Sequence, residues 1–233
     1  MTPPETNSLG QPIGYRVEHW KPPPIPSDQV MEGRFCRLER LDPSKHGPSL
    51  FAANATDVDG AMWTYLPYGP FPAVEGYLAW LNERAKATDT VFFAIIDRAH
   101  DRAVGLASYL RMDPMAGSIE VGHLAYSPLL QRTPAATEAM RLMMERVFDL
   151  GYRRYEWKCD ALNAPSASAA RRLGFVFEGI FRQAWVVKGR NRDSAWFSVL
   201  DREWPRLRDR FAIWLAPANF DENGRQKKPL AEC

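Results

Sequence analysis

One stretch in the middle of the chain constrains the fold more than any other. Residues 134–150 have the clearest helical period in the sequence, because apolar side chains recur there at spacings of four and three residues: Ala136, Met140, Met143, Val147 and Leu150. Gly151 follows and supplies a C-terminal stop. Strand-like segments lie on both sides, at residues 118–126 and 152–160. The stretch therefore predicts a strand–helix–strand unit, which the fold of the whole chain has to contain.

The remaining elements are predicted from alternation, turn residues and helix start signals. Further strands are expected at residues 35–41, 90–97, 103–111, 175–187 and 193–200. Further helices are expected at residues 46–54, 73–86, 165–173 and 203–215. Strands come first, then a β-α-β-α unit, then a hairpin. This order predicts a mixed α+β fold rather than a doubly wound sheet.

The two ends of the chain differ from its centre. Residues 1–32 are rich in proline and poor in large apolar side chains, which predicts an arm that lies on the body or stays mobile. The run Pro22-Pro23-Pro24 would suit a polyproline II ligand, but a leader lying on the surface is the favoured interpretation. Residues 33–216 are expected to form the folded domain, and residues 217–233 a loose polar tail.

Charge and composition argue against several classes of protein. The chain has 233 residues, of which 30 are basic and 28 acidic, and the two kinds are mixed along it. A dedicated nucleic-acid binder usually has a clustered basic face, so no nucleic-acid partner is expected. Three distant cysteines and four isolated histidines predict no metal site. No apolar run is long enough for a membrane span and no signal-like leader is present, so a cytoplasmic location is expected.

The loop before the helix at residues 134–150 is a candidate anion site. A strand that runs into a helix N-terminus leaves backbone N–H groups unpaired, and the helix dipole adds partial positive charge there. Gln131, Arg132 and Thr133 place an amide, a guanidinium and a hydroxyl at this position. The site therefore suits a phosphate, although this pattern alone fits a packing role equally well.

Several motifs, taken together, carry a family resemblance. Residues 131–136 (Gln-Arg-Thr-Pro-Ala-Ala) are similar to the acyl-CoA signature Q/R-x-x-G-x-G/A, and residues 137–139 (Thr-Glu-Ala) continue it. Asn163-Ala164-Pro165-Ser166 and Leu173-Gly174-Phe175 match a second signature. Further matches are Trp63-Thr64-Tyr65-Leu66, Phe71, Glu120-Val121-Gly122, Glu178-Gly179, Arg182 and Asp193. Over about residues 33–205 the chain thus resembles the GNAT superfamily, in particular its RimJ/RimL-type branch of ribosomal-protein N-terminal acetyltransferases.

The resemblance implies a fold, an activity and a cofactor site. The fold is a mixed, mostly antiparallel sheet of about seven strands that is splayed in the middle and flanked by helices. The activity is acetyl-CoA-dependent N-acetyl transfer, directly to a primary amine of a protein N-terminus or a small molecule, in a ternary complex. The implied acetyl-CoA site comprises Leu124, Ala125, Tyr126, Gln131, Arg132, Thr133, Ala135, Ala136, Thr137, Asn163 and Ser166. The formation of a homodimer is a further possibility that the sequence leaves open.

One departure motivates an alternative function. Pro134 stands where the signature has glycine, and proline lacks an N–H that a pyrophosphate would use. Arg132 would then supply the missing positive contact. The alternative is a catalytically inactive GNAT-fold module that binds an acyl-CoA or a protein partner.

The resemblance also assigns the chemistry to a few side chains. Glu120 is the first candidate for the general base, directly or through water, and its competing interpretation is a salt-bridged strand glutamate. Ser166 is the candidate proton donor for the leaving thiolate, and Asn163 is expected to cap the following helix. His123 has a suitable unperturbed pKa, but strand alternation turns it away from Glu120 unless a bulge intervenes.

The aromatic, proline-rich segment 62–71 is the candidate acceptor site. Trp63, Tyr65, Tyr68 and His123 are the predicted substrate-binding residues. Trp63 fits a place in the core at least as well. The nature of the acceptor amine stays open.

Overall fold

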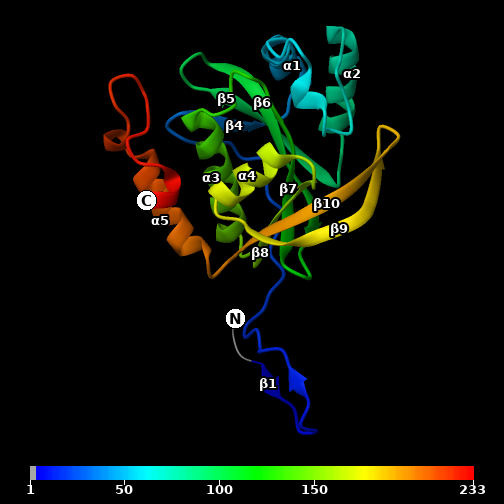
Figure 1. Ribbon diagram of the computed structural model, residues 1–233, viewed down its shortest axis with the longest axis vertical. Helices are drawn as coiled ribbons and strands as arrows, with labels where there is room; N and C mark the ends of the chain where they lie inside the picture. Colours follow the sequence, from blue (N-terminus) through cyan, green and yellow to red (C-terminus); the bar gives the residue numbers. More distant parts are fainter. Residues whose placement is uncertain (1–3) are drawn as a thin grey trace.

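A single large sheet organises the body of the molecule (Figure 1). The computed structural model describes residues 4–233, and within them eight strands pair in the order β3-β4-β5-β6-β7-β8-β10-β9. Their bounds are Met31–Glu32, Cys36–Arg40, Thr90–Asp97, Arg102–Asp113, Ser118–Tyr126, Arg154–Asp160, Val176–Val187 and Arg190–Leu200 for β3 to β10. Only β7 and β8 pair in parallel; the other neighbours are antiparallel. The predicted mixed, mostly antiparallel α+β sheet is confirmed, with the short β3 as an additional strand.

Helices cover both faces of this sheet. Their bounds are Pro43–Asn54 (α1), Val74–Ala85 (α2), Pro134–Asp149 (α3), Ala164–Arg172 (α4) and Trp204–Leu215 (α5), with 3₁₀ turns at Ala61–Trp63 (η1), Pro217–Asn219 (η2) and Leu230–Glu232 (η3). Successive side chains of β5 point to opposite faces of the sheet, so this strand contributes to two separate hydrophobic clusters. Phe92 and Ala94 belong to the cluster under α1 and α2, whereas Phe93 and Ile95 belong to the cluster under α3 and α5. Within residues 4–233, no helix is long and apolar enough to cross a membrane.

The helix α3 begins and ends where its sequence signals lie. The hydroxyl of Thr133 accepts a hydrogen bond from the Ala136 N–H at 3.2 Å, and Pro134 occupies the first helical position, where its missing N–H costs no intrahelical bond. Gly151 follows the helix with a φ of 93°, a conformation that glycine adopts without strain. The carboxylate of Glu138 also accepts the N–H groups of Phe35 at 2.6 Å and of Cys36 at 2.9 Å, which ties α3 to the start of β4.

The sheet opens between β7 and β8. Their parallel pairing extends only from Ser118 with Arg154 to Val121 with Trp157. Beyond Val121, β7 remains paired with β6 alone, while β8 continues beside β10. The splayed centre of the sheet is therefore present, and it leaves one backbone edge of β7 without a neighbouring strand.

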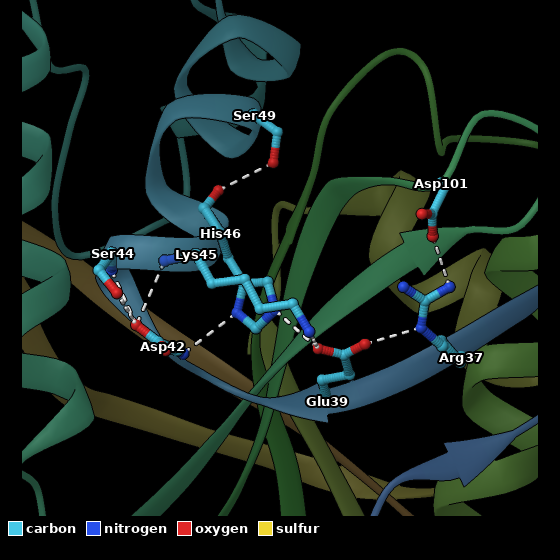
Figure 2. Close-up of polar contacts among 8 residues, drawn as sticks. All are labelled: Arg37, Glu39, Asp42, Ser44, Lys45, His46, Ser49 and Asp101. Carbon is cyan, nitrogen blue, oxygen red and sulfur yellow. Dashed lines mark hydrogen bonds and ion pairs between the residues drawn. The ribbon is translucent and has the colours of Figure 1, made fainter.

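A polar network centred on Glu39 and the buried His46 fixes the start of α1 to β4 (Figure 2). Asp42 caps the helix by accepting the Ser44 N–H at 2.9 Å, and the Nδ1 atom of His46 accepts the Asp42 N–H at 3.1 Å. The carboxylate of Glu39 contacts the His46 Nε2 atom at 3.0 Å and also pairs with Lys45 and Arg37. Burial alone would raise the pKa of Glu39, but these hydrogen bonds outweigh it and lower the pKa to about 2. The network holds α1, and with it the aromatic segment between α1 and α2, against the sheet.

The N-terminal arm differs in part from the prediction. Two short strands, Glu5–Thr6 (β1) and Pro12–Ile13 (β2), form a hairpin that projects from the body (Figure 1). Residues 20–30 instead lie on the body, where the Trp20 ring contacts Gly117. Met31 is buried in the sheet as part of β3, so the arm ends at residue 30 rather than 32.

The expectation of a loose tail at residues 217–233 is wrong. Leu230 is 2% exposed, and Phe220 stacks edge-on against Trp214 of α5 with 5.4 Å between ring centroids. The Trp214 Nε1 atom donates to the Gln226 Oε1 atom at 2.8 Å. The few apolar residues of this polar segment thus suffice to hold it on α5.

Candidate active site

A cavity of about 480 Å³ lies where β7 and β8 diverge. Its walls are formed by residues of β6 to β10, the start of α4 and the segment after η1. The volume falls within the usual range of small-molecule sites. The opening of the sheet thus places side chains from distant parts of the chain around one space.

Glu120 forms part of the cavity wall and belongs to a buried ion network. Its residue is 3% exposed; its Oε1 atom accepts from the Arg111 Nη1 atom and its Oε2 atom from the Lys158 Nζ atom, both at 2.7 Å. Lys158 also contacts the Glu156 Oε2 atom at 2.8 Å. The parallel register that pairs Glu120 with Glu156 brings the two carboxylates to one lysine. Glu120 is therefore salt-bridged and at the same time placed beside the cavity.

Local geometry explains why these partners meet. The β6–β7 register shifts between Leu110 and Asp113, and Arg111 there has a φ of 45°. This bulge turns Arg111 toward Glu120. Burial alone would raise the pKa of Glu156, but hydrogen bonds from Arg154 and Lys158 outweigh it and lower the pKa. Sequence reasoning missed Arg111 and Lys158 as partners, because only the strand register shows that they converge.

His123 reaches the cavity because β7 has a bulge. The register pairs Gly122 with Ser108 and Ala125 with Leu106, so His123 and the residue after it face one residue of β6, and His123 has a φ of 50°. β7 therefore has the bulge that strand alternation required for His123 to reach the site, and His123 lines the same cavity as Glu120. Burial, reinforced by Arg84 and Arg111, lowers the pKa of His123 to about 4. The imidazole is therefore neutral near pH 7.

The start of α4 supplies the other polar part of the cavity. The Asn163 Oδ1 atom accepts the Ser166 N–H at 3.1 Å, so the predicted cap is present. The Ser166 hydroxyl oxygen accepts from the Trp157 Nε1 atom at 3.0 Å, which leaves its own proton available to another acceptor. Cys159 also lines the cavity, and burial raises the pKa of its thiol, which therefore remains protonated near neutral pH.

The turn before α3 lies outside the cavity. The Gln131 Nε2 atom donates to the Tyr126 carbonyl at 2.8 Å, and the Thr133 hydroxyl donates to the Leu130 carbonyl at 2.7 Å. Two of the three polar side chains expected at the phosphate site therefore hold the turn itself. Arg132 has a φ of 61°, and within residues 4–233 no carboxylate lies within 4 Å of its guanidinium. Its side chain is exposed to solvent at the N-terminus of α3.

The segment after η1 divides into core and cavity residues. Trp63 is 5% exposed and packs against Phe71, and Tyr68 stacks between Trp80 and His123 with centroid distances of 4.2 and 5.6 Å. Burial raises the pKa of Tyr68 far above its usual value. Tyr65 instead lines the cavity, and its hydroxyl donates to the Leu162 carbonyl at 3.1 Å.

The structure thus separates the predicted site residues into two groups. Those that line the cavity are Tyr65, Glu120, His123, Leu124, Asn163 and Ser166. Those that lie outside its lining are Trp63, Tyr68, Ala125, Tyr126, Gln131, Arg132, Thr133, Ala135, Ala136 and Thr137. Most of the second group forms the turn and first helical residues that follow β7.

The β9–β10 hairpin provides lining residues that sequence reasoning missed. Phe181 and Trp185 of β9 line the cavity although they are 57% and 54% exposed. A bulge at Gln183, with a φ of 51°, sets their register, and its N–H donates to the Asp193 carboxylate at 2.7 Å. The sequence hints at these lining residues only through the large aromatic side chains in the strand expected at residues 175–187. Within residues 4–233, no cluster of side chains suited to a metal ion is present.

Comparison with known proteins identifies the family. Residues 37–176 match the model of the acetyltransferase (GNAT) domain, which is more than half of the chain. The chain belongs to the GNAT family of acetyltransferases. The match covers the splayed strands, α3 and α4, and thus most of the cavity walls, whereas the lining residues of the β9–β10 hairpin follow the matched range.

Solved structures and a curated protein agree with this membership. A GCN5-related N-acetyltransferase from Brucella melitensis is 50% identical, with a TM-score of 0.91 over 93% of this chain and 98% of that one. A probable GNAT-family acetyltransferase from Chromobacterium violaceum is 41% identical, with a TM-score of 0.78 over 88% of this chain and all of that one. An uncharacterized N-acetyltransferase, p20, from Bacillus licheniformis is 26% identical over 63% of this chain and 84% of its own. This GNAT chain is accordingly classed as an N-acetyltransferase.

The RimL-type resemblance extends to the fold. An acetyltransferase from Salmonella typhimurium that modifies the N-terminal serine of ribosomal protein L7/L12 is 18% identical, with a TM-score of 0.63 over 74% of this chain and 99% of that one. At this identity the likeness concerns the fold alone. It leaves the acceptor of the GNAT chain open.

Proposed function

We propose that this GNAT chain transfers an acetyl group from acetyl-CoA directly to a primary amine held in the cavity between β7 and β8. One observation carries the proposal: the unpaired edge of β7, the capped start of α4 and the buried Glu120 meet at the same cavity. An open strand edge offers backbone hydrogen bonds, Ser166 offers a proton, and Glu120 offers a carboxylate. The strand edge suits the pantetheine arm of acetyl-CoA, and acyl transfer to an amine needs a proton donor and a base beside it.

The residues present suit acetyl-CoA. Residues 122–126 of β7 have no partner strand on the β8 side, so their backbone groups can bind the amides of the pantetheine arm. At the start of α3, the Ala135 N–H has no intrahelical partner and the unpaired Arg132 guanidinium adds positive charge. Pro134 removes one N–H donor, and Arg132 compensates for it with a charge-assisted contact to the pyrophosphate.

Proton transfer is assigned to Glu120 and Ser166. The Lys158 contact of Glu120 is buried, whereas the side chain of Arg111 is 44% exposed. The Oε1 atom, which faces Arg111, is therefore the oxygen that takes a proton from the amine, directly or through water. The amine arrives as ammonium and loses two protons, of which Glu120 takes one. The nitrogen–carbon bond forms, the carbon–sulfur bond breaks, and the Ser166 hydroxyl gives its proton to the sulfur and is restored by the second proton from the nitrogen. His123 is neutral and its ring packs against Tyr68 and Phe92, so it stays among the acceptor-binding residues.

Pro134 also favours a second candidate, a GNAT-fold module that binds an acyl-CoA without transfer. The two candidates differ in what Ser166 does. Under the module hypothesis, Ser166→Ala changes neither binding nor turnover, because there is no thiolate to protonate.

Release of CoA in the presence of acetyl-CoA and a panel of primary amines tests the proposal. We expect release with some amines, and a rise in melting temperature with acetyl-CoA alone. Ser166→Ala should lower the turnover number at least tenfold, or roughly 1.4 kcal/mol of barrier, while the stabilisation by acetyl-CoA persists. Ser168→Ala, on the exposed side of the same helix, is the matched control. Stabilisation by acetyl-CoA without CoA release for any amine would favour the binding module.

A further inference from the structure

Two charged residues of the cavity lining have no counter-ion within 4 Å in the described part of the chain. Glu120 pairs with both Arg111 and Lys158, and Lys158 also pairs with Glu156, which lies outside the cavity lining. Arg192 and Asp160 also line the cavity. Within residues 4–233, no carboxylate lies within 4 Å of Arg192, and no basic side chain lies within 4 Å of Asp160.

These two residues lie on one wall of the cavity. Ser194 of β10 is the register partner of Asp160 at the end of β8. Arg192 lies two residues before Ser194 on the same strand, and its Nε atom donates to the Ser194 hydroxyl at 3.2 Å. That bond orients the guanidinium and leaves its Nη atoms without a carboxylate. Asp160 accepts the Leu162 N–H at 2.9 Å through Oδ1, so Oδ2 remains for a ligand. The wall thus presents a positive and a negative group side by side but not in contact.

Apolar surface adjoins this pair of charges. Phe181 packs on Trp196 with 4.4 Å between ring centroids, and both line the cavity together with Trp185. Phe181 and Trp185 remain more than half exposed on β9. Large aromatic surface left in a site of this kind favours a ligand with an apolar body.

We propose that the acceptor is a free amino acid with an apolar or aromatic side chain, an inference that rests on the proposed function. Its carboxylate pairs with Arg192, its ammonium group with Asp160, and its side chain packs on Phe181 and Trp185. Of the two protons lost by the ammonium group, one goes to Glu120 and the other ends on the sulfur through Ser166. The nitrogen then carries the acetyl group.

The same charges disfavour the other acceptor classes. At a protein N-terminus the corresponding carboxylate is an amide, so Arg192 would stay unpaired in the cavity. A polyamine has no carboxylate for Arg192 and would bring additional positive charge beside it. A free amino acid is the acceptor whose two charges match the two that the protein leaves unpaired.

A matched set of acceptors tests the inference in the CoA-release assay. Leucine, phenylalanine and tryptophan are each compared with their carboxamides and decarboxylated amines, beside a tripeptide that begins with the same residue and spermidine. For at least one set, kcat/KM should be about 10- to 100-fold higher for the free amino acid, the range for a hydrogen bond between charged groups. Arg192→Gln should abolish most of this preference by raising KM for the free amino acid and leaving the carboxamide unchanged. Arg190→Gln, exposed at the β9–β10 turn, should keep it.

The outcomes separate the inference from the function on which it rests. Transfer to the carboxamide, the tripeptide or spermidine that equals or exceeds transfer to the free amino acid overturns the inference and leaves the transferase function standing. A preference for free amino acids that survives Arg192→Gln also overturns it. No transfer to any amine overturns both.

Discussion

His123 should make the free energy of unfolding depend on pH in the acidic range. Burial, together with Arg84 and Arg111, lowers the pKa of His123 to about 4, against 6.5 for a solvated imidazole. Between these values the unfolded chain binds a proton that the folded chain does not. By linkage, the free energy of unfolding therefore falls as the pH is lowered through this window.

The magnitude follows from the two pKa values. The full effect is about 3 kcal/mol, and the part lost between pH 7 and pH 5 is about 2 kcal/mol. His123→Asn removes the titrating group, and asparagine tolerates the φ of 50° at this position. The variant loses ring packing against Phe92 and Tyr68 at every pH. Its loss of unfolding free energy from pH 7 to pH 5 should nevertheless be about 2 kcal/mol smaller than that of the wild type.

Urea unfolding at pH 7, 6 and 5 measures this difference. His19→Asn is the control, because His19 is exposed and has a similar positive φ of 56°. The control should follow the pH dependence of the wild type. If His123→Asn shows the same pH dependence as the wild type, burial does not lower the pKa of the His123 imidazole.

Three further predictions concern other parts of the chain. Lys158→Met leaves Glu120 and Glu156 without their shared cation and should lower the free energy of unfolding by about 3–5 kcal/mol in urea titrations at pH 7; a loss below about 1 kcal/mol would contradict the buried network. Arg132→Gln should raise KM for acetyl-CoA several-fold with kcat unchanged, whereas an unchanged KM would remove Arg132 from the phosphate site. Leu230→Ala should cost about 2–3 kcal/mol in thermal or urea unfolding, and a cost near zero would mean that the tail is loose after all.

Elements with a strong local pattern could be predicted from the sequence. The strands at residues 90–97 and 118–126 have the predicted bounds, and α3 differs from its prediction by one residue. The strand β3 could not be predicted, because two residues carry no period and Met31 joins the sheet only through its pairing with β4. The docking of the tail was missed for a similar reason, since isolated apolar residues such as Leu230 give no pattern.

The candidate site could be predicted only where a residue acts through its own local motif. Asn163 caps α4 as its spacing from Ser166 predicts. The partners of Glu120 depend on strand register and on the bulge at Arg111, neither of which a single strand sequence shows. The same holds for Arg192, which reaches the cavity because the β9–β10 hairpin lies beside β8.

The proposed function depends most on Glu120, which we expect to take part in acetyl transfer in the cavity between β7 and β8. The most direct test is the turnover number of CoA release for Glu120→Gln, measured beside acetyl-CoA binding by the same protein. Glu145→Gln, on the outer part of α3 and paired only with Arg141 within residues 4–233, is the matched control. We expect at least a tenfold loss of turnover for Glu120→Gln, intact acetyl-CoA binding and an unchanged control. Wild-type turnover in a folded Glu120→Gln protein would contradict it.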